Sequence, residues 1–88
     1  MKFGMYAIKD AKTGFMTPTV DQNDASALRN FEHAVNQPDS LLNSHPNDFA
    51  LYLLGEFDTD AGISTPRDKE KYFPVLIADA SEVLRREG

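Results

Sequence analysis

The chain has 88 residues, of which 41% are hydrophobic and 26% are charged, and its formal net charge is −5. This length suits one small domain, and the negative charge argues against a protein that coats nucleic acid with its whole surface. The chain has no cysteine, which excludes disulfides, thiolate chemistry and sulfur-ligated zinc, and no apolar run approaches the ~20 residues of a membrane span. We expect a single domain over residues 1–88, without a membrane partner. A chain this small buries only ~60–65% of its unfolded surface, so we also expect a homodimer.

The first predicted element is a β-strand over residues 1–8. Two sets of residues alternate there with the two-residue period of a strand: Phe3, Met5 and Ala7 against Lys2, Gly4 and Tyr6. We expect the more apolar first set to face the core, which leaves Lys2 and Tyr6 on the opposite face. Residues 15–20 then return antiparallel, and Pro18 confines this strand to an edge or ends it early, because proline has no N–H to donate.

A turn pattern occurs twice in the chain, 48 residues apart. Asp10 and Asp58 each stand four residues before a glycine, and Thr-Pro follows each glycine three and four residues later. In both copies the aspartate can bond the turn backbone and the glycine can adopt the positive φ that closes the turn. The pattern predicts two β-hairpins. Two explanations of the repeated pattern remain open: internal duplication, or convergence on favourable turn chemistry.

An amphipathic helix is the most strongly patterned element. Its apolar positions recur at helical spacing: Ala27, Leu28, Phe31, Ala34 and Val35. Asp21, Asn23 or Asp24 can cap its start, and we expect Asn36, as a left-handed cap, and Pro38 to end it.

The second half of the chain predicts a loop, a central strand and a short helix. Residues 37–48 form the loop, with one helical turn at Leu41 and Leu42, and residues 49–57 form the strand, with a bulge at Gly55. A charged linker over residues 66–72 precedes a further strand that starts at Pro74.

The chain is expected to end in this short helix. Asp79 and Glu82 form a capping-box pattern at its start, and Arg85 and Arg86 lie where its dipole favours cations. The resulting fold class is α+β: a small antiparallel sheet built from two β-hairpins, covered by one main helix, with a short C-terminal helix.

Searches for catalytic and metal-binding patterns give no site. Residues 58–69 begin like a calcium loop, but Ile63 and Lys69 occupy the positions that require glycine and glutamate. His33 and His45 lack a partner at ligand spacing, and the Ser44-His45 pair with Asp48 lacks a nucleophile turn. We therefore expect a noncatalytic protein without a metal or a cofactor.

The positive charge of the chain gathers in its first hairpin. Residues 1–20 carry three lysines against Asp10 alone, whereas residues 45–88 carry five bases and nine acids. Stacking rings beside ammonium groups are the minimum that single-stranded nucleic acid requires. The candidate binding residues of this hairpin are Lys2, Tyr6, Lys9, Lys12 and Phe15, with Lys9 and Lys12 at the turn and Phe15 returning beside them. The alternative is that Tyr6 covers part of a sheet and the lysines keep an edge soluble.

Several blocks of the sequence resemble the small nonstructural protein of gokushoviruses, the icosahedral single-stranded DNA phages of the Microviridae. The similarity covers about residues 1–66, and the residues that carry it are Met1 to Asp10, Lys12 to Asp21, Asn23-Asp24, Ser26-Ala27, Arg29-Asn30-Phe31, His33-Ala34-Val35, Asp48-Phe49, Leu51-Tyr52, Gly55, Phe57 and Asp58. The resemblance implies a non-capsid protein made in the infected bacterium, with a role in DNA binding and in genome synthesis or packaging. Arg29, Asn30 and His33 lie in these blocks on the polar side of the helix, and they are further candidates for nucleic-acid contact. Since one helical turn separates Arg29 from His33, their spacing predicts a contiguous polar surface for phosphate, a base or another protein; the alternative is a solvated helix surface.

We expect a phage accessory protein of the host bacterial cytoplasm that binds single-stranded DNA weakly and locally. It would act in the switch to single-strand genome synthesis or in packaging. The alternative is a protein-interaction module that docks on a phage or host replication or assembly protein and does not touch nucleic acid; its acidic second half would suit a basic partner.

Overall fold

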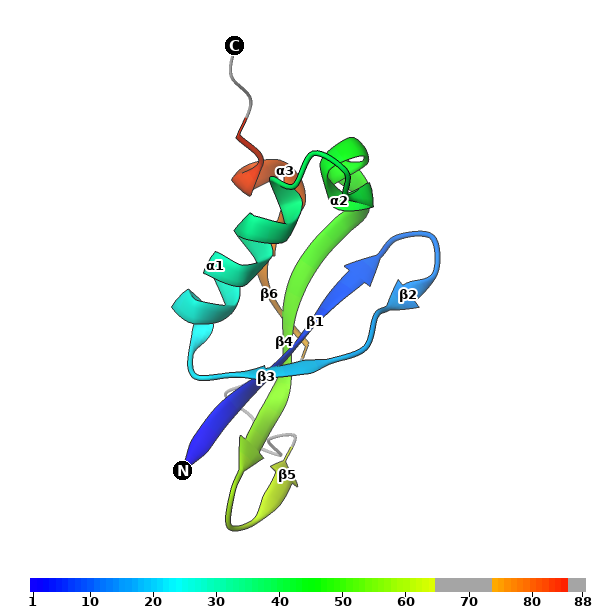
Figure 1. The fold of residues 1–88 in the computed structure, drawn as a ribbon. Helices are drawn as coiled ribbons and strands as arrows, with labels where there is room; N and C mark the ends of the chain where they lie inside the picture. The colour runs from blue at the N-terminus through cyan, green and yellow to red at the C-terminus, as the bar shows by residue number, and fades with distance from the viewer. Residues whose placement is uncertain (65–73, 86–88) are drawn as a thin grey trace.

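The computed structural model describes residues 1–64 and 74–85, which form a six-stranded antiparallel sheet with three α-helices (Figure 1). In chain order the elements are β1 (Lys2–Asp10), β2 (Gly14–Phe15), β3 (Thr19–Asp21), α1 (Asp24–Val35), α2 (Leu41–Ser44), the 3₁₀ helix η1 (Pro46–Asp48), β4 (Phe49–Asp58), β5 (Gly62–Ser64), β6 (Val75–Asp79) and α3 (Ala80–Val83). The predicted α+β fold class is confirmed. The expected linker over residues 66–72 and the dipole contact of Arg86 lie outside the described residues.

The two long strands β1 and β4 form the centre of the sheet. They pair antiparallel over their whole length, from Lys2 opposite Asp58 to Asp10 opposite Phe49. Strands β2 and β3 pair with the other edge of β1, while β5 and β6 pair with the other edge of β4. A long strand, two short strands that pair with its outer edge and a helix therefore occur twice, as β1–β2–β3–α1 and as β4–β5–β6–α3. The repetition thus includes whole elements as well as the two turns at Asp10 and Asp58.

Both hairpin turns have the predicted chemistry. Gly14 and Gly62 have φ values of 99° and 89°, which other residues rarely adopt. Asp10 Oδ1 accepts a hydrogen bond from the Lys12 N–H at 2.9 Å, and Asp58 Oδ1 accepts one from the Asp60 N–H at 2.9 Å. Each aspartate thus fixes the backbone two residues ahead of it.

Two irregularities of the sheet also follow the sequence. The returning strand is split into β2 and β3, and Pro18 lies in the gap between them. The pairing of β1 with β4 shifts between Met5 and Tyr6, so Leu54 is an extra residue next to Gly55. The predicted bulge near Gly55 is confirmed.

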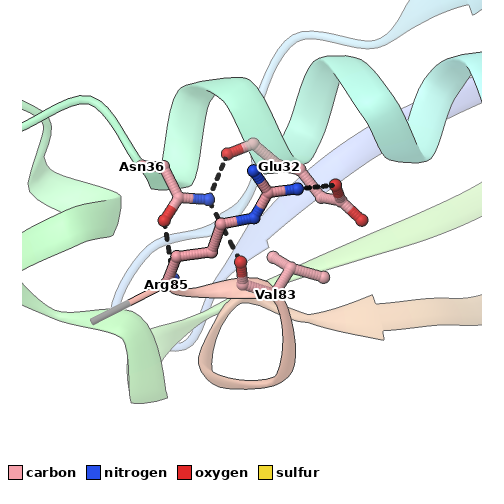
Figure 2. A network of polar contacts seen from close by, with 4 residues as sticks. All are labelled: Glu32, Asn36, Val83 and Arg85. Atoms are coloured by element: carbon pink, nitrogen blue, oxygen red, sulfur yellow. Dashed lines mark hydrogen bonds and ion pairs between the residues drawn. The ribbon is translucent and has the colours of Figure 1, made fainter. Parts of the chain in front are cut away.

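Helix α1 begins and ends where predicted, but the geometry of its C-terminal cap differs from the prediction. The Asn23 side chain caps its start by accepting a hydrogen bond from the Ser26 N–H at 2.8 Å. At its end Asn36 has φ −90° and ψ 3°, so the predicted left-handed cap is wrong. The side chain of Asn36 replaces it: Nδ2 donates to the carbonyl oxygens of Glu32 and Val83, and Oδ1 accepts from the Arg85 N–H (Figure 2).

The core lies between the sheet and the helices. Its buried residues come from the sheet and from all three described α-helices: Tyr6, Ala27, Phe31, Val35, Leu42, Phe49, Leu51, Ala78 and Ala80. Tyr6 is only 2% exposed, so the prediction that it lies on the exposed face of the first strand is wrong. A Cβ at Gly4 would lie 2.5 Å from Tyr6 Cε2, which shows that the Tyr6 ring lies close over the glycine. The absent side chain leaves room for the ring.

Candidate nucleic-acid interface

The two faces of the sheet differ because α1 and α3 pack on the same one (Figure 1). Directly opposite residues of neighbouring strands share a face, so the strand registers define the other, open face. Its side chains occupy four rows across the sheet: Phe3, Phe57 and Ile63; Met5 and Val20; Ala7, Tyr52 and Leu76; and Phe15, Lys9, Ala50 and Asp79. We call these residues the open face. Four of them are aromatic.

The open face is mostly apolar and partly accessible, although Ala7 within it is only 3% exposed. Val20, Ile63 and Leu76 are 51%, 66% and 49% exposed, and Phe15 is 44% exposed. Exposed apolar residues that gather on one surface are typical of interaction sites, whereas scattered ones need no explanation.

Lys9, Phe15 and Tyr52 form a compact group at one end of this face. The rings of Phe15 and Tyr52 meet edge to face, with centroids 5.5 Å apart and planes at 86°. Lys9 Nζ lies 5.3 Å from the Phe15 centroid and 5.9 Å from the Tyr52 centroid. This geometry can offer one base an aromatic surface and one phosphate an ammonium group.

Acidic groups limit the positive field around this group. A hollow of about 370 Å³ beside Tyr52 is lined by Lys9 but also by Asp48 and Asp79. Lys12 lies at the exposed tip of the same hairpin. The local charge suits contact with one or two phosphates rather than with a long polyanion.

Lys2 and Tyr6 lie apart from this group. Lys2 is seven residues from Lys9 along β1, about 23 Å at the rise of a strand, and it occupies the other face. Tyr6 is in the core, where its hydroxyl donates a 2.5 Å hydrogen bond to Asp24 Oδ1. Burial raises the pKa of the Tyr6 hydroxyl well above its ordinary value, and the bond to Asp24 raises it further. Tyr6 therefore cannot serve as a stacking platform.

The helix candidates Arg29, Asn30 and His33 divide into two places. Asn30 Nδ2 donates to Asp21 Oδ2 at 2.9 Å, toward β3. Arg29 and His33 instead line a hollow of about 240 Å³ with Arg85, where Glu32 lies 3.6 Å from the Arg85 guanidinium. The three residues do not form the contiguous polar surface that their spacing suggested.

Tyr52 is the residue of this site that was not predicted from the sequence. It lies in the strongly apolar strand β4, and an apolar run of this kind predicts that the helix covers its residues. The available signal was its place in the pairing, opposite Ala7 in β1, two residues from Lys9. That signal requires the register of β1 against β4, two strands that no hairpin turn joins and whose pairing shifts at Leu54.

The histidines have only local contacts. Ser44 Oγ lies 2.8 Å from His45 Nδ1, and His33 Nε2 lies 3.0 Å from Gln37 Nε2, all at exposed positions. Within residues 1–64 and 74–85, no group of three metal-ligating side chains is close enough to hold an ion. None of the helices in this part of the chain is long and apolar enough to cross a membrane.

One comparison with known proteins gives a match. The sequence model of a family described as Phage ORF5 protein matches residues 3–83, which includes every described strand and helix except the first residue of β1. No curated protein and no solved structure matches the chain.

Proposed function

Because the chain belongs to the phage ORF5 protein family, we propose that it is a noncatalytic phage accessory protein that binds single-stranded DNA weakly on its open face. In this proposal it acts in the host bacterial cytoplasm. The basis for this location is the resemblance of the sequence to the small nonstructural protein of the Microviridae gokushoviruses. Its role is in the switch to single-strand genome synthesis or in packaging of the genome.

The observation that supports DNA binding is the position of the Lys9 ammonium beside two aromatic rings, Phe15 and Tyr52, on a partly accessible sheet face. Every base presents a flat surface that can stack, so an aromatic ring binds single strands with little sequence preference. A lysine next to the ring can pair with the adjoining phosphate. Both groups are held by regular strands, since Lys9 lies directly opposite Phe15 in the pairing of β1 with β2.

Charge sets the expected strength of binding. The chain carries 14 acidic against 9 basic side chains, so long-range attraction to DNA is weak. If Lys9 and Lys12 each contact one phosphate, the logarithm of the affinity should fall with the logarithm of salt concentration with a slope of about −1.4. Binding should therefore be measurable at low salt and lost at high salt.

Fluorescence anisotropy with a labelled single-stranded oligonucleotide tests this function. Phe15→Ala should weaken binding about 5-fold or more because a stacking ring is lost, and Lys9→Glu should reduce the salt slope by at least about 0.7. Arg29→Glu is the matched control, since it makes the same charge change at an exposed position on α1. Equal losses from Lys9→Glu and Arg29→Glu would reject the open face as the binding site. Absence of binding at low salt would reject the function.

A protein-docking role is the second candidate, and the exposed apolar residues Val20, Ile63 and Leu76 favour it. DNA binding does not account for the exposure of these three apolar side chains. A homodimer or a complex with a phage or host replication protein would cover them. Capture from infected cells with nuclease treatment separates the two candidates. A single partner retained after nuclease treatment, and lost on Leu76→Lys, would favour docking. Light scattering of the purified protein measures the homodimer.

A further inference from the structure

A groove of about 410 Å³ opens on the helix side of the sheet, between α1 and the connection from β2 to β3. Figure 1 shows this connection and β3 crossing in front of β1 and β4 before the chain enters α1. The groove exists because Pro18 interrupts the strand: β2 pairs with Lys9 and Asp10, β3 pairs with residues 4–6, and β1 has no strand partner on this side between them. Small side chains of α1, Ala27 and Ala34, leave the space open.

The floor and the rim of the groove differ in chemistry. Tyr6, Phe31 and Leu51 form an apolar floor, and Met16 lines it from the connection. Thr17, Thr19, Asp21 and Asn30 supply the polar lining. The groove therefore combines an apolar slot with a polar margin, and its volume lies within the ~300–1,000 Å³ of small-molecule sites.

The margin is rich in hydrogen-bond acceptors. Bonds from the Ser26 side chain, the Gln22 N–H and Asn30 hold the pKa of the Asp21 carboxyl below its ordinary value, so it is charged at neutral pH. Asn30 uses Nδ2 for Asp21, which leaves its Oδ1 without a hydrogen-bond partner among the described residues. A carboxylate at the margin repels phosphate and accepts from an amino group.

We propose that this groove binds a nucleobase that carries an exocyclic amino group, such as cytosine or adenine. The flat apolar faces of the base fit between Met16 and the floor, while its amino group donates to Asp21 or to Asn30 Oδ1. Thymine lacks the amino group and presents a carbonyl oxygen to the carboxylate instead.

This proposal rests on the proposed function, because the single-stranded DNA bound on the open face would supply the base. Phe15 belongs to the open face and the next residue, Met16, lines the groove, so the two sites meet around one edge of the sheet. A single strand that crosses this edge can stack one base on Phe15 and place a neighbouring base in the groove. The groove thereby supplies a base preference that the stacking surface lacks.

Nuclear magnetic resonance titration of the full chain with free deoxycytidine, deoxyadenosine and thymidine tests the proposal. Deoxycytidine and deoxyadenosine should shift the amide signals of Thr19, Asn30 and Phe31, and thymidine should bind about 5-fold or more weakly. Ala34→Leu fills the groove and should abolish these shifts. Ala25→Leu makes the same change at an exposed position of α1 and should keep them. Asp21→Asn, which adds no bulk, should bring the deoxycytidine and thymidine affinities to within about 2-fold.

The outcomes separate this proposal from the proposed function. Equal binding of thymidine and deoxycytidine by the unmodified protein, or shifts unchanged by Ala34→Leu, would overturn the groove as a base site. An oligonucleotide that shifts Phe15 and Tyr52 while no nucleoside shifts the groove would overturn this inference and leave the proposed function standing. Nucleosides that enter the groove with the expected preference, together with no oligonucleotide binding on the open face, would support the inference and reject the proposed function.

Discussion

At the scale of single residues, the contact between Gly4 and Tyr6 decides how β1 packs. A methyl group at position 4 would lie 2.5 Å from Cε2 and from the hydroxyl oxygen of Tyr6, a distance that real side chains do not tolerate. We expect Gly4→Ala to lower the free energy of unfolding by about 1–3 kcal/mol, measured by urea denaturation. In the Tyr6→Leu background the same substitution should cost much less, because the obstructing ring is gone. Additive costs would contradict the proposed clash.

The hydroxyl of Tyr6 should make stability depend on alkaline pH. The pKa of Tyr6 is raised in the folded state, mainly by burial and then by Asp24, above the ordinary value of 10.0. The unfolded chain then loses this proton first, so the stabilisation is present below pH 10 and is lost as pH rises above it. Tyr6→Phe should cost about 1 kcal/mol at neutral pH and flatten the decline above pH 10.

Tyr52→Phe is the matched control for this measurement, since it leaves Tyr6 and its bond to Asp24 in place. Thermal unfolding between pH 7 and pH 11 measures both variants. An alkaline decline that is the same in Tyr6→Phe and in the unmodified protein would assign the effect to other groups.

Residue-level features explain why the sequence predicted the alternation of β1 but not its orientation. Phe3, Met5 and Ala7 are the more apolar set, so burial alone assigns them to the core. The helix covers the other set because Gly4 makes room for the Tyr6 ring and Asp24 accepts a hydrogen bond from its hydroxyl. Both contacts connect the strand with residues whose proximity no local pattern shows.

At the scale of elements, Asn36 joins the end of α1 to α3 (Figure 2). Its amide nitrogen donates to Glu32 O at 2.8 Å and to Val83 O at 3.1 Å, and its oxygen accepts from the Arg85 N–H at 2.7 Å. We expect Asn36→Ala to lower the free energy of unfolding by about 2 kcal/mol, since these bonds are lost together. Hydrogen exchange should quicken at the Leu84 amide, whose bond to Ala80 O belongs to α3.

Asn36→Asp separates the bonds of this residue. The aspartate keeps an acceptor for Arg85 and loses both donors, so it should retain only part of the stability that Asn36→Ala removes. Unchanged exchange at Leu84 in both variants would show that packing of Ala80, not Asn36, fixes α3 on the core.

Elements whose signals are local were predicted well. Both hairpin turns, the start of α1 at Asn23 and the split at Pro18 follow from the preferences of single residues. The position of the end of α1 at Asn36 was also predicted, but its capping contact was not, because the Asn36 side chain bonds Val83, 47 residues away. Asp79 stands at the start of α3 as predicted, but its side chain makes no capping hydrogen bond to the helix.

At the scale of the whole molecule, the sheet separates a helix-covered side from an open, aromatic side. The sequence predicted a basic first hairpin with Phe15 returning beside Lys9, and the structure brings these two together. It could not predict that Tyr52 joins them, because that contact depends on the register of β1 against β4. The sequence also could not predict that Lys2 and Arg29 lie apart from Lys9. A count of charges along the chain does not show which face of the sheet each charge occupies.

The most direct test of the DNA-binding account is a nuclear magnetic resonance titration of the protein with an unlabelled oligothymidine at low salt. Thymidine has little affinity for the groove in this account, so the signals that shift should belong to Lys9, Phe15 and Tyr52. Added salt should reverse these shifts. Shifts confined to Arg29, His33 and Arg85 on the helix side, or no shifts at millimolar oligonucleotide, would contradict the account.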